Sequence, residues 1–235
     1  MDVHFAVAKI SKYASSESGD TLEMIERPHG GISFVLVDGQ RSGKSAKVIS
    51  NMVARKAIQL LAEGVRDGAA ARAAHDYLYT HRRGQVSATL NILSVDATTK
   101  TFVISRNNEA PVIIYVPEAG FTLFDEPCRS VGTHRNTKPH IKELPIAVGM
   151  MVVVYTDGLR HAGSLSGTHR YDPLAALQRM VADGVCDAQV VADTLLAEAM
   201  AMDKGRPRDD ISVLVAQVLP EQGHAVRRME VHLPL

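Results

Sequence analysis

Four aspartates stand where a turn meets an apolar, strand-like segment: Asp20 in SGDT, Asp38 in LVDG, Asp157 in YTDG and Asp209 in RDDI. Each alone is ordinary, because Asp-Gly is a common turn pair and Asp-Asp is commonly a solvated loop. Together they are more informative, since the segments beside the last three are expected to be the most buried strands. If these strands lie side by side in the core, the carboxylates converge at one rim.

Converging carboxylates favour a cation site. They repel one another unless cations neutralise them, and hard oxygen ligands of this kind suit Mg²⁺ or Mn²⁺. A glycine after the acid lets the backbone approach closely, so the carbonyl of Gly39 can serve as a ligand beside Asp38. Two such ions would activate a water and clamp a phosphoryl group for in-line displacement. The pattern indicates phosphoester hydrolysis without a covalent enzyme intermediate.

The stretch DGQRSGKS also suggests a nucleotide-binding loop. Such a loop requires GxxxxGK[ST] between a parallel strand and a helix, so that backbone N–H groups encircle the phosphate. Here Gly39 and Gly43 enclose one residue too few, and the strand before them belongs to a predicted hairpin. A nucleotide hydrolase is the less favoured alternative, in which Asp157 would supply the second acid and Lys44 would contact the nucleotide.

Hydrophobic periodicity predicts the elements that position these residues. Helices are expected at 45–63, 69–82, 173–182 and 187–202. Single strands are expected at 4–14 and 211–219, and an antiparallel pair joined at Gly30-Gly31 is expected at 21–27 and 32–38. A meander of antiparallel strands is expected over 86–124, followed by two strands within 140–157. Strand runs interrupted by two helical pairs predict an α+β fold: a four-layer αββα sandwich with two central, mainly antiparallel sheets flanked by helix pairs. Residues 220–235 are expected to be a tail or an added edge strand.

Composition narrows the class of function. Lysines plus arginines equal aspartates plus glutamates at 26 each, so no net field favours nucleic acid or a membrane surface. There is no apolar run of membrane-spanning length and no signal-peptide pattern at the N-terminus. The only cysteines, Cys128 and Cys186, are far apart, as expected in a reducing cytosol. We therefore expect a cytoplasmic protein.

The chain resembles the metal-dependent serine/threonine protein phosphatases of type 2C, and specifically their bacterial SpoIIE-like branch. The matching segments occur in family order: SGD at 18–20, VDGQRSGKSA at 37–46, YTDGL at 155–159 and DDIS at 209–212. No single motif is specific, but four in order are fairly specific. The resemblance spans residues 1–219 and implies one phosphatase domain.

The resemblance implies a role for each acid. Asp38 would bridge two Mn²⁺ or Mg²⁺ ions, and Gly39 would offer its carbonyl to one of them. Asp157 and Asp209 would complete the second site, and Asp20 would orient a metal-bound water or ligate through it. Asp210 takes the place of Asp209 if the alignment of that pair is off by one.

Some positions depart from the family pattern. Many members have a histidine after Asp-Gly, a candidate general acid, where this chain has Gln40, which has no labile proton at neutral pH. The branch usually reads Asn-Ala-Gly-His where this chain has NNEAP, in which only Asn107 fits. The ten histidines show neither HxH nor HExxH spacing, so core or surface roles are expected for each. Arg41 and Lys44 are weak candidates for phosphate binding and otherwise solvated loop charges.

The expected activity is therefore that of a protein-serine/threonine phosphatase. Similarity to short stress-signalling relatives implies a phosphorylated regulatory protein of the STAS-domain type as substrate. The departures keep open a second interpretation, a degenerate member that binds phosphoprotein without hydrolysing it.

Overall fold

The computed structural model describes residues 1–235 except 29, 165–169, 222, 224–225 and 235. The histidines at 29, 169 and 224, and part of the tail beyond residue 219, therefore lie outside the described residues. No helix among the residues described is long and apolar enough to cross a membrane.

Within the described residues, ten strands form two antiparallel sheets of five strands each. Sheet A has the order β1-β10-β9-β6-β7, with bounds Asp2–Ile10, Ile211–Leu219, Met151–Tyr155, Val112–Val116 and Gly120–Phe124. Sheet B has the order β2-β3-β4-β5-β8, with bounds Asp20–Glu26, Ile32–Gly39, Ala88–Asp96, Thr101–Asn107 and His140–Pro145. The two sheets face each other across an apolar core.

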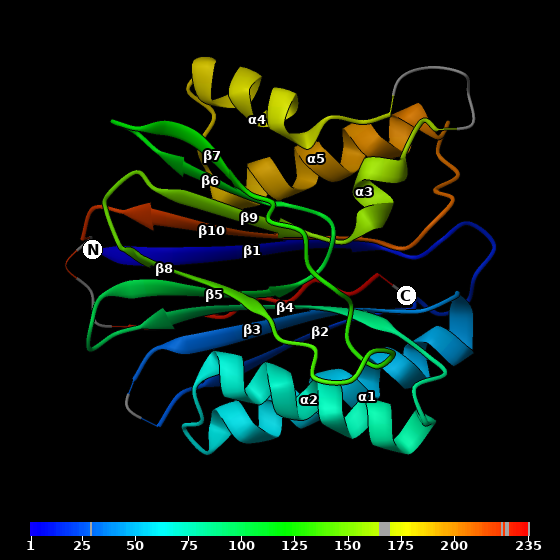
Figure 1. The fold of residues 1–235 in the computed structure, drawn as a ribbon. Helices are drawn as coiled ribbons and strands as arrows, with labels where there is room; N and C mark the ends of the chain where they lie inside the picture. Colours follow the sequence, from blue (N-terminus) through cyan, green and yellow to red (C-terminus); the bar gives the residue numbers. More distant parts are fainter. Residues whose placement is uncertain (29, 165–169, 222, 224–225, 235) are drawn as a thin grey trace.

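Helices cover the outer face of each sheet, as Figure 1 shows. On sheet B lie α1 (Gly43–Ala62) and α2 (Asp67–Arg82), and on the side of sheet A lie α3 (Asp157–His161), α4 (Pro173–Ala182) and α5 (Ala188–Met202). The apolar core accordingly has three parts, one between the sheets and one under each helix layer. The predicted α+β four-layer sandwich is confirmed.

Strand β9 shows why the central strands read as continuous apolar runs. All five of its residues are buried, because it lies in the middle of sheet A with α-helices on one side and sheet B on the other. Alternate residues serve the two cores: Val152 and Val154 pack between the sheets, whereas Val153 packs toward the helices.

The predicted meander over 86–124 is wrong in its pairing. Strands β4 and β5 pair within sheet B, but β6 and β7 pair within sheet A, so the chain crosses between sheets after Asn107. The alternation of inward and outward side chains along a strand is the same in either sheet. The local sequence pattern therefore does not indicate to which sheet a strand belongs. The first strand also ends earlier than predicted, at Ile10, and residues 11–14 begin the loop to β2.

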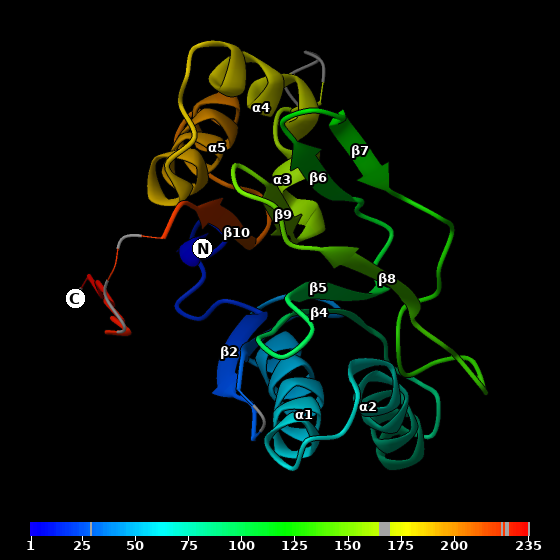
Figure 2. The same cartoon turned by 90° about the vertical axis from the view of Figure 1, so that its left-hand side faces the viewer.

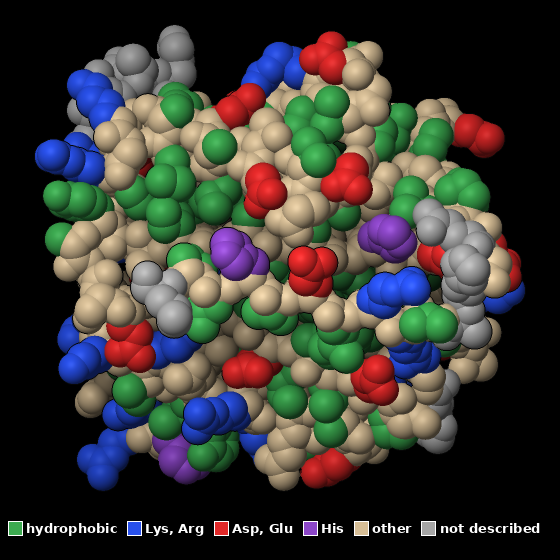
Figure 3. Space-filling model, turned by 180° about the vertical axis from the view of Figure 1, so that it is seen from behind, with side chains coloured by type: hydrophobic (Ala, Val, Ile, Leu, Met, Phe, Trp, Pro, Cys, Tyr) green, Lys and Arg blue, Asp and Glu red, His purple; other side chains and the backbone are tan. Residues whose placement is uncertain are grey.

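The described residues of the segment 220–235 form no helix or strand. Figure 2 shows this segment on the outside of the sandwich, near β1 and β2. It contacts β2 through Arg227, whose Nη1 lies 3.2 Å from Oε1 of Glu26. On the face drawn in Figure 3, acidic and basic side chains are interspersed with apolar ones, in keeping with the balanced composition.

Candidate metal centre

The hairpin of β2 and β3 brings the first two aspartates together. Its turn closes with Arg27 N donating to Gly31 O at 3.1 Å and Gly30 N donating to Arg27 O at 3.1 Å. Gly30 and Gly31 both have positive φ, at 85° and 89°, which glycine adopts without strain. The resulting register sets Asp20 opposite Asp38, so both side chains lie on the face of sheet B that meets sheet A.

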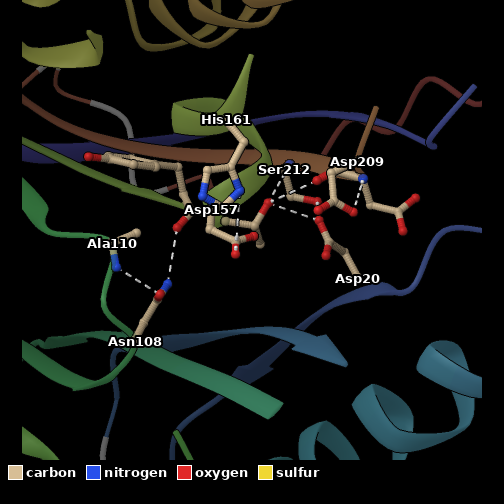
Figure 4. Close-up of polar contacts among 10 residues, drawn as sticks. Asp20, Asn108, Ala110, Asp157, His161, Asp209 and Ser212 are labelled. Carbon is tan, nitrogen blue, oxygen red and sulfur yellow. Dashed lines mark hydrogen bonds and ion pairs between the residues drawn. The ribbon is translucent and has the colours of Figure 1, made fainter. Parts of the chain in front are cut away.

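Asp20 ties the two sheets together at this rim. It is fully buried, and its Oδ2 accepts hydrogen bonds from Ser212 Oγ at 2.6 Å and from Thr156 Oγ1 at 3.0 Å, both from sheet A or its immediate end. Its other oxygen, Oδ1, has no hydrogen-bond partner among the described residues. Figure 4 shows Asp20 turned toward Ser212, close to Asp209. One buried carboxylate oxygen is thus left for another ligand.

Two further acids come from sheet A. Asp157 is the first residue of α3, separated from the end of β9 by one residue, and Asp209 lies in the loop that enters β10. Since β9 and β10 are neighbours, these two acids meet at the same edge. One turn along α3, His161 joins them: the ligand atoms of Asp157, His161 and Asp209 all lie within 4.8 Å of one another.

Asp209 and Asp210 are neighbours in the chain with different surroundings. Asp210 is buried, and its two oxygens accept hydrogen bonds from the backbone N–H groups of Lys12 at 2.9 Å and Gly19 at 2.8 Å. It therefore fastens both ends of the loop between β1 and β2. Asp209 lines the cleft instead.

The glycines after two of the acids are needed for packing. A Cβ on Gly39 would lie 2.1 Å from the carbonyl oxygen of Ala46 in α1, and a Cβ on Gly158 would lie 2.1 Å from that of Asp210. Real Cβ atoms do not come so close, so any other residue would push these backbones apart. The Asp-Gly pairs thus let α1 and the β10 entry pack against the acid-bearing turns.

The acids open onto a cleft of about 580 Å³ between the ends of the two sheets. Asp38, Asp157 and Asp209 line it, while the cationic side chains among its lining residues are Arg41, Arg160 and Arg170. The cleft therefore contains both an acidic cluster and arginine side chains, which come from three separate segments of the chain. Lys44 is exposed and is not one of the residues described as lining the cleft.

The cluster is electrostatically unfavourable without a cation. Burial, and then the negative charges of Asp20, Asp157 and Asp209, together raise the pKa of Asp38 to about 9. Burial also raises the pKa of Asp20 to about 6, although hydrogen bonds from Ser212 and Thr156 act in the opposite direction. The pKa of Asp209 is raised by burial and then by Asp157.

A divalent cation fits this arrangement. The donors are carboxylate oxygens with one imidazole nitrogen, and Asp20 retains an unpartnered buried oxygen. A bound cation would favour the charged form of each carboxylate and so remove the repulsion that raises their pKa values. Acids of this type suit hard ions such as Mg²⁺ and Mn²⁺.

Gln40 and the NNEAP segment, which contain the departures from the family pattern, fix loops around the cleft. Gln40 donates its backbone N–H to Ser87 O at 3.0 Å, and its Oε1 accepts from Ser87 N at 3.0 Å. Asn107 donates through Nδ2 to Arg129 O and Lys138 O, at 2.9 and 3.1 Å. The next residue, Asn108, lines the cleft and donates to Tyr155 O at 3.3 Å.

Sequence reasoning missed three of the residues that line the cleft. The sequence predicts only a core or surface role for His161 and no role for Arg160 or Arg170, because YTDG indicates a turn and not the start of the short helix α3. The spacing of Asp157 and His161, four residues apart, is the signal that a helical interpretation would have used. Among the predicted phosphate contacts, Arg41 lines the cleft with a positive φ of 81°, whereas Lys44 points to solvent.

Comparison with known proteins agrees with this geometry. The family model for Stage II sporulation protein E (SpoIIE) matches residues 28–219. Among solved structures, the PP2C phosphatase domain of SpoIIE from Bacillus subtilis, with a fragment of its regulatory domain, is 18% identical, with a TM-score of 0.77. That match covers 93% of this chain and 63% of the SpoIIE chain, so this chain spans less than two thirds of that protein's solved length. No curated protein sequence gave a significant match.

Two other solved structures contain metal ions. The catalytic domain of the serine threonine protein phosphatase PstP, in complex with two manganese ions, is 15% identical, with a TM-score of 0.69 and coverage of 93% of this chain and 99% of that one. RsbX in complex with magnesium is 16% identical, with a TM-score of 0.67 and coverage of 92% and 94%. At such identities the likeness shows a shared fold. Because the family model covers most of the sequence, the chain belongs to the SpoIIE family, whose domain has the PP2C-like phosphatase fold.

Proposed function

We propose that this protein is a metal-dependent serine/threonine phosphoprotein phosphatase. The observation that carries the proposal is the convergence of Asp38, Asp157 and Asp209 on one cleft, where burial and mutual repulsion raise the pKa of Asp38 to about 9. A cluster of carboxylates that repel one another destabilises the fold unless cations bind to it, so its presence favours a metal site. The phosphatase domain is assigned to residues 1–219.

The ligands are proposed as follows. Asp38 would contribute its carboxylate to both Mn²⁺ or Mg²⁺ sites, and the carbonyl of Gly39 would add an oxygen to one of them. Asp157 and Asp209 would hold the second ion, and Asp20 would orient a metal-bound water through Oδ1, which has no hydrogen-bond partner among the described residues. Asp209 is preferred to Asp210 because both oxygens of Asp210 already accept backbone hydrogen bonds.

When bound, the ions would supply an activated water and neutralise charge on the phosphoryl group. The arginines that line the cleft, Arg41, Arg160 and Arg170, would bind and orient that group through charge-assisted hydrogen bonds. Gln40 cannot donate a labile proton, and its Oε1 is engaged with Ser87. The proton for the serine or threonine leaving group therefore comes from water in the open cleft or from another group.

The substrate is proposed to be a phosphorylated regulatory protein of the STAS type. Support comes from the SpoIIE family membership and from the fold shared with RsbX and with a protein of the bacterial stressosome. The cytoplasmic location expected from the sequence stays a prediction.

The direct test is turnover of p-nitrophenyl phosphate, and then of a phosphoserine protein, with Mn²⁺. Asp38→Asn keeps the shape of the side chain and removes a charged ligand, so we expect turnover to fall at least about a hundredfold. Asp193→Asn, on the exposed face of α5, is the matched control and should leave turnover unchanged. Failure of the unaltered protein to hydrolyse either substrate with any divalent ion would leave the phosphoprotein-binding interpretation in its place.

A further inference from the structure

His161 lies in the acidic cluster although no motif places it there. It occupies the last position of α3, its side chain is 47% exposed, and it lines the cleft with Asp157 and Asp209. Figure 4 shows its imidazole beside the carboxylate of Asp157, with Asp209 on the far side of that carboxylate. The helical spacing of four residues puts both side chains on one face of α3.

The distance between these two groups is within ion-pair range but excludes a direct hydrogen bond. Nδ1 of His161 lies 3.8 Å from Oδ2 of Asp157, which is longer than a hydrogen bond. His140 and Glu126 show what a direct pair looks like in the same protein, because their Nδ1 and Oε2 are 2.8 Å apart. The cluster around His161 is therefore more open than a direct imidazole–carboxylate pair.

The same spacing suits two ligands of one ion. Ligand oxygens and nitrogens lie about 2.1 Å from a small divalent metal, so ligands of an octahedral ion are about 3 Å apart when adjacent and about 4.2 Å apart when opposite. The ligand atoms of Asp157, His161 and Asp209 lie within 4.8 Å of one another, close to this range. Small side-chain rotations would bring all three onto one ion. The unpartnered Oδ1 of buried Asp20 is an independent sign that the neighbouring acids lack a ligand.

We propose that His161 is a nitrogen ligand of the ion held by Asp157 and Asp209, and that it makes this site prefer Mn²⁺ to Mg²⁺. The inference rests on the proposed function and specifies its second metal site. Mg²⁺ takes oxygen ligands almost exclusively, whereas imidazole binds the divalent transition metals well. An imidazole among the ligands therefore lowers the affinity of the site for Mg²⁺ relative to its affinity for Mn²⁺.

Electron spin-echo spectroscopy of bound Mn²⁺ tests the proposal without relying on activity. The unaltered protein should show the nitrogen modulation of a directly coordinated imidazole. In His161→Ala that modulation should disappear, and the ratio of Mg²⁺ to Mn²⁺ dissociation constants, measured by calorimetry, should fall about tenfold. His161→Asp restores an oxygen ligand, so it should bind Mn²⁺ without the modulation and with the lower preference. His140→Ala, which removes a histidine paired with a carboxylate outside the cleft, should match the unaltered protein.

Each contrary result has a defined meaning. If the unaltered protein binds Mn²⁺ without nitrogen modulation, or if His161→Ala keeps both the modulation and the preference, His161 is not a ligand and the inference is overturned while the phosphatase proposal stands. If the unaltered protein binds no Mn²⁺, or if Asp157→Asn binds it unchanged, both fail together.

Discussion

Asp67 at the start of α2 and Asp38 at the rim of the cleft are both carboxylates beside sheet B, but their partners differ in charge. Oδ2 of Asp67 lies 3.3 Å from Nη1 of Arg27, and its Oδ1 accepts a hydrogen bond from Ser94. Asp38 has three further acids around it, Asp20, Asp157 and Asp209, and their negative charges raise its pKa. One carboxylate is compensated within the fold and the other is not.

This difference distinguishes a buried carboxylate that stabilises the fold from buried carboxylates that have a functional role. A buried carboxylate with a cation and a hydroxyl as partners holds elements together, here α2, β4 and the turn after β2. A cluster of like charges destabilises the fold, and its presence is accounted for by a ligand from outside. Substitutions should therefore act in opposite directions at the two places.

The largest effect is expected from substituting the two adjacent acids before β10, Asp209 and Asp210, because one should affect turnover and the other stability. Asp209→Asn should reduce Mn²⁺-dependent turnover at least about a hundredfold, because a charged ligand is lost, without lowering the unfolding free energy in metal-free buffer. Asp210→Asn should lower the unfolding free energy by about 2 kcal/mol, because an amide group replaces one acceptor of a buried backbone N–H. Turnover assays with Mn²⁺ and urea unfolding measure these two quantities, and calorimetric titration follows Mn²⁺ binding. The assignment is reversed if Asp210→Asn abolishes Mn²⁺ binding and Asp209→Asn does not.

At the compensated carboxylate we expect a loss of stability alone. Asp67→Ala should cost about 3 kcal/mol in urea unfolding, because it leaves the largely buried guanidinium of Arg27 without its charge partner. Turnover per folded molecule should not change. The double variant Arg27→Met, Asp67→Leu should cost less than the single one, since no unpaired charge remains. A larger cost for the double variant would show that the ion pair itself stabilises the fold.

The pH dependence of the metal-free protein should reveal the cluster. In the folded state the pKa of Asp38 is raised to about 9 and that of Asp20 to about 6, both above the ordinary value of 3.8, so the folded protein binds more protons than the unfolded chain. The stabilisation from these protons is complete below the ordinary pKa and is lost as pH rises. With EDTA present, the unfolding free energy should fall by several kcal/mol between pH 5 and pH 9, at about 1.4 kcal/mol for each pH unit over which folded Asp38 keeps its proton.

Two additions identify the source of that pH dependence. Mn²⁺ should oppose the loss, because it binds the charged carboxylates, and Asp38→Asn should flatten the curve in EDTA. A metal-free protein whose stability stays level or rises over this interval would contradict the described repulsion.

The smallest effect is expected at Lys44. Its side chain is exposed and does not line the cleft, so Lys44→Ala should change Mn²⁺-dependent turnover less than about twofold. A nucleotide hydrolase would instead lose ATP or GTP binding with this lysine. Nucleotide binding by the unaltered protein that disappears in Lys44→Ala would revive that alternative.

Much of the fold and of the acid cluster could be predicted because the signals are local. The helical period of α1 and the order of the four acid-bearing motifs can be read within short windows of sequence. The sheet to which β6 belongs could not, because strand pairing is decided by distant segments. The three strands beside the acids illustrate this: β9 and β10 are neighbours, but β3 lies in the other sheet, so the acids meet across the sandwich and not along one edge.

The remaining parts of the site depend on details of one or two residues. Helix α3 has five residues, too few for a hydrophobic period, so the placement of His161 was missed. The distinct surroundings of Asp209 and Asp210 follow from which side chain faces the Gly19 and Lys12 amides, and identical residue types carry no sequence signal of this.

Crystals soaked in Mn²⁺ and measured at the manganese absorption edge would test the central claim most directly. The account predicts anomalous peaks in the cleft within coordination distance of Asp38, Asp157 and Asp209, and their loss in Asp38→Asn crystals soaked in the same way. Unaltered crystals with no peak at these three carboxylates, or with manganese bound only elsewhere, would contradict it.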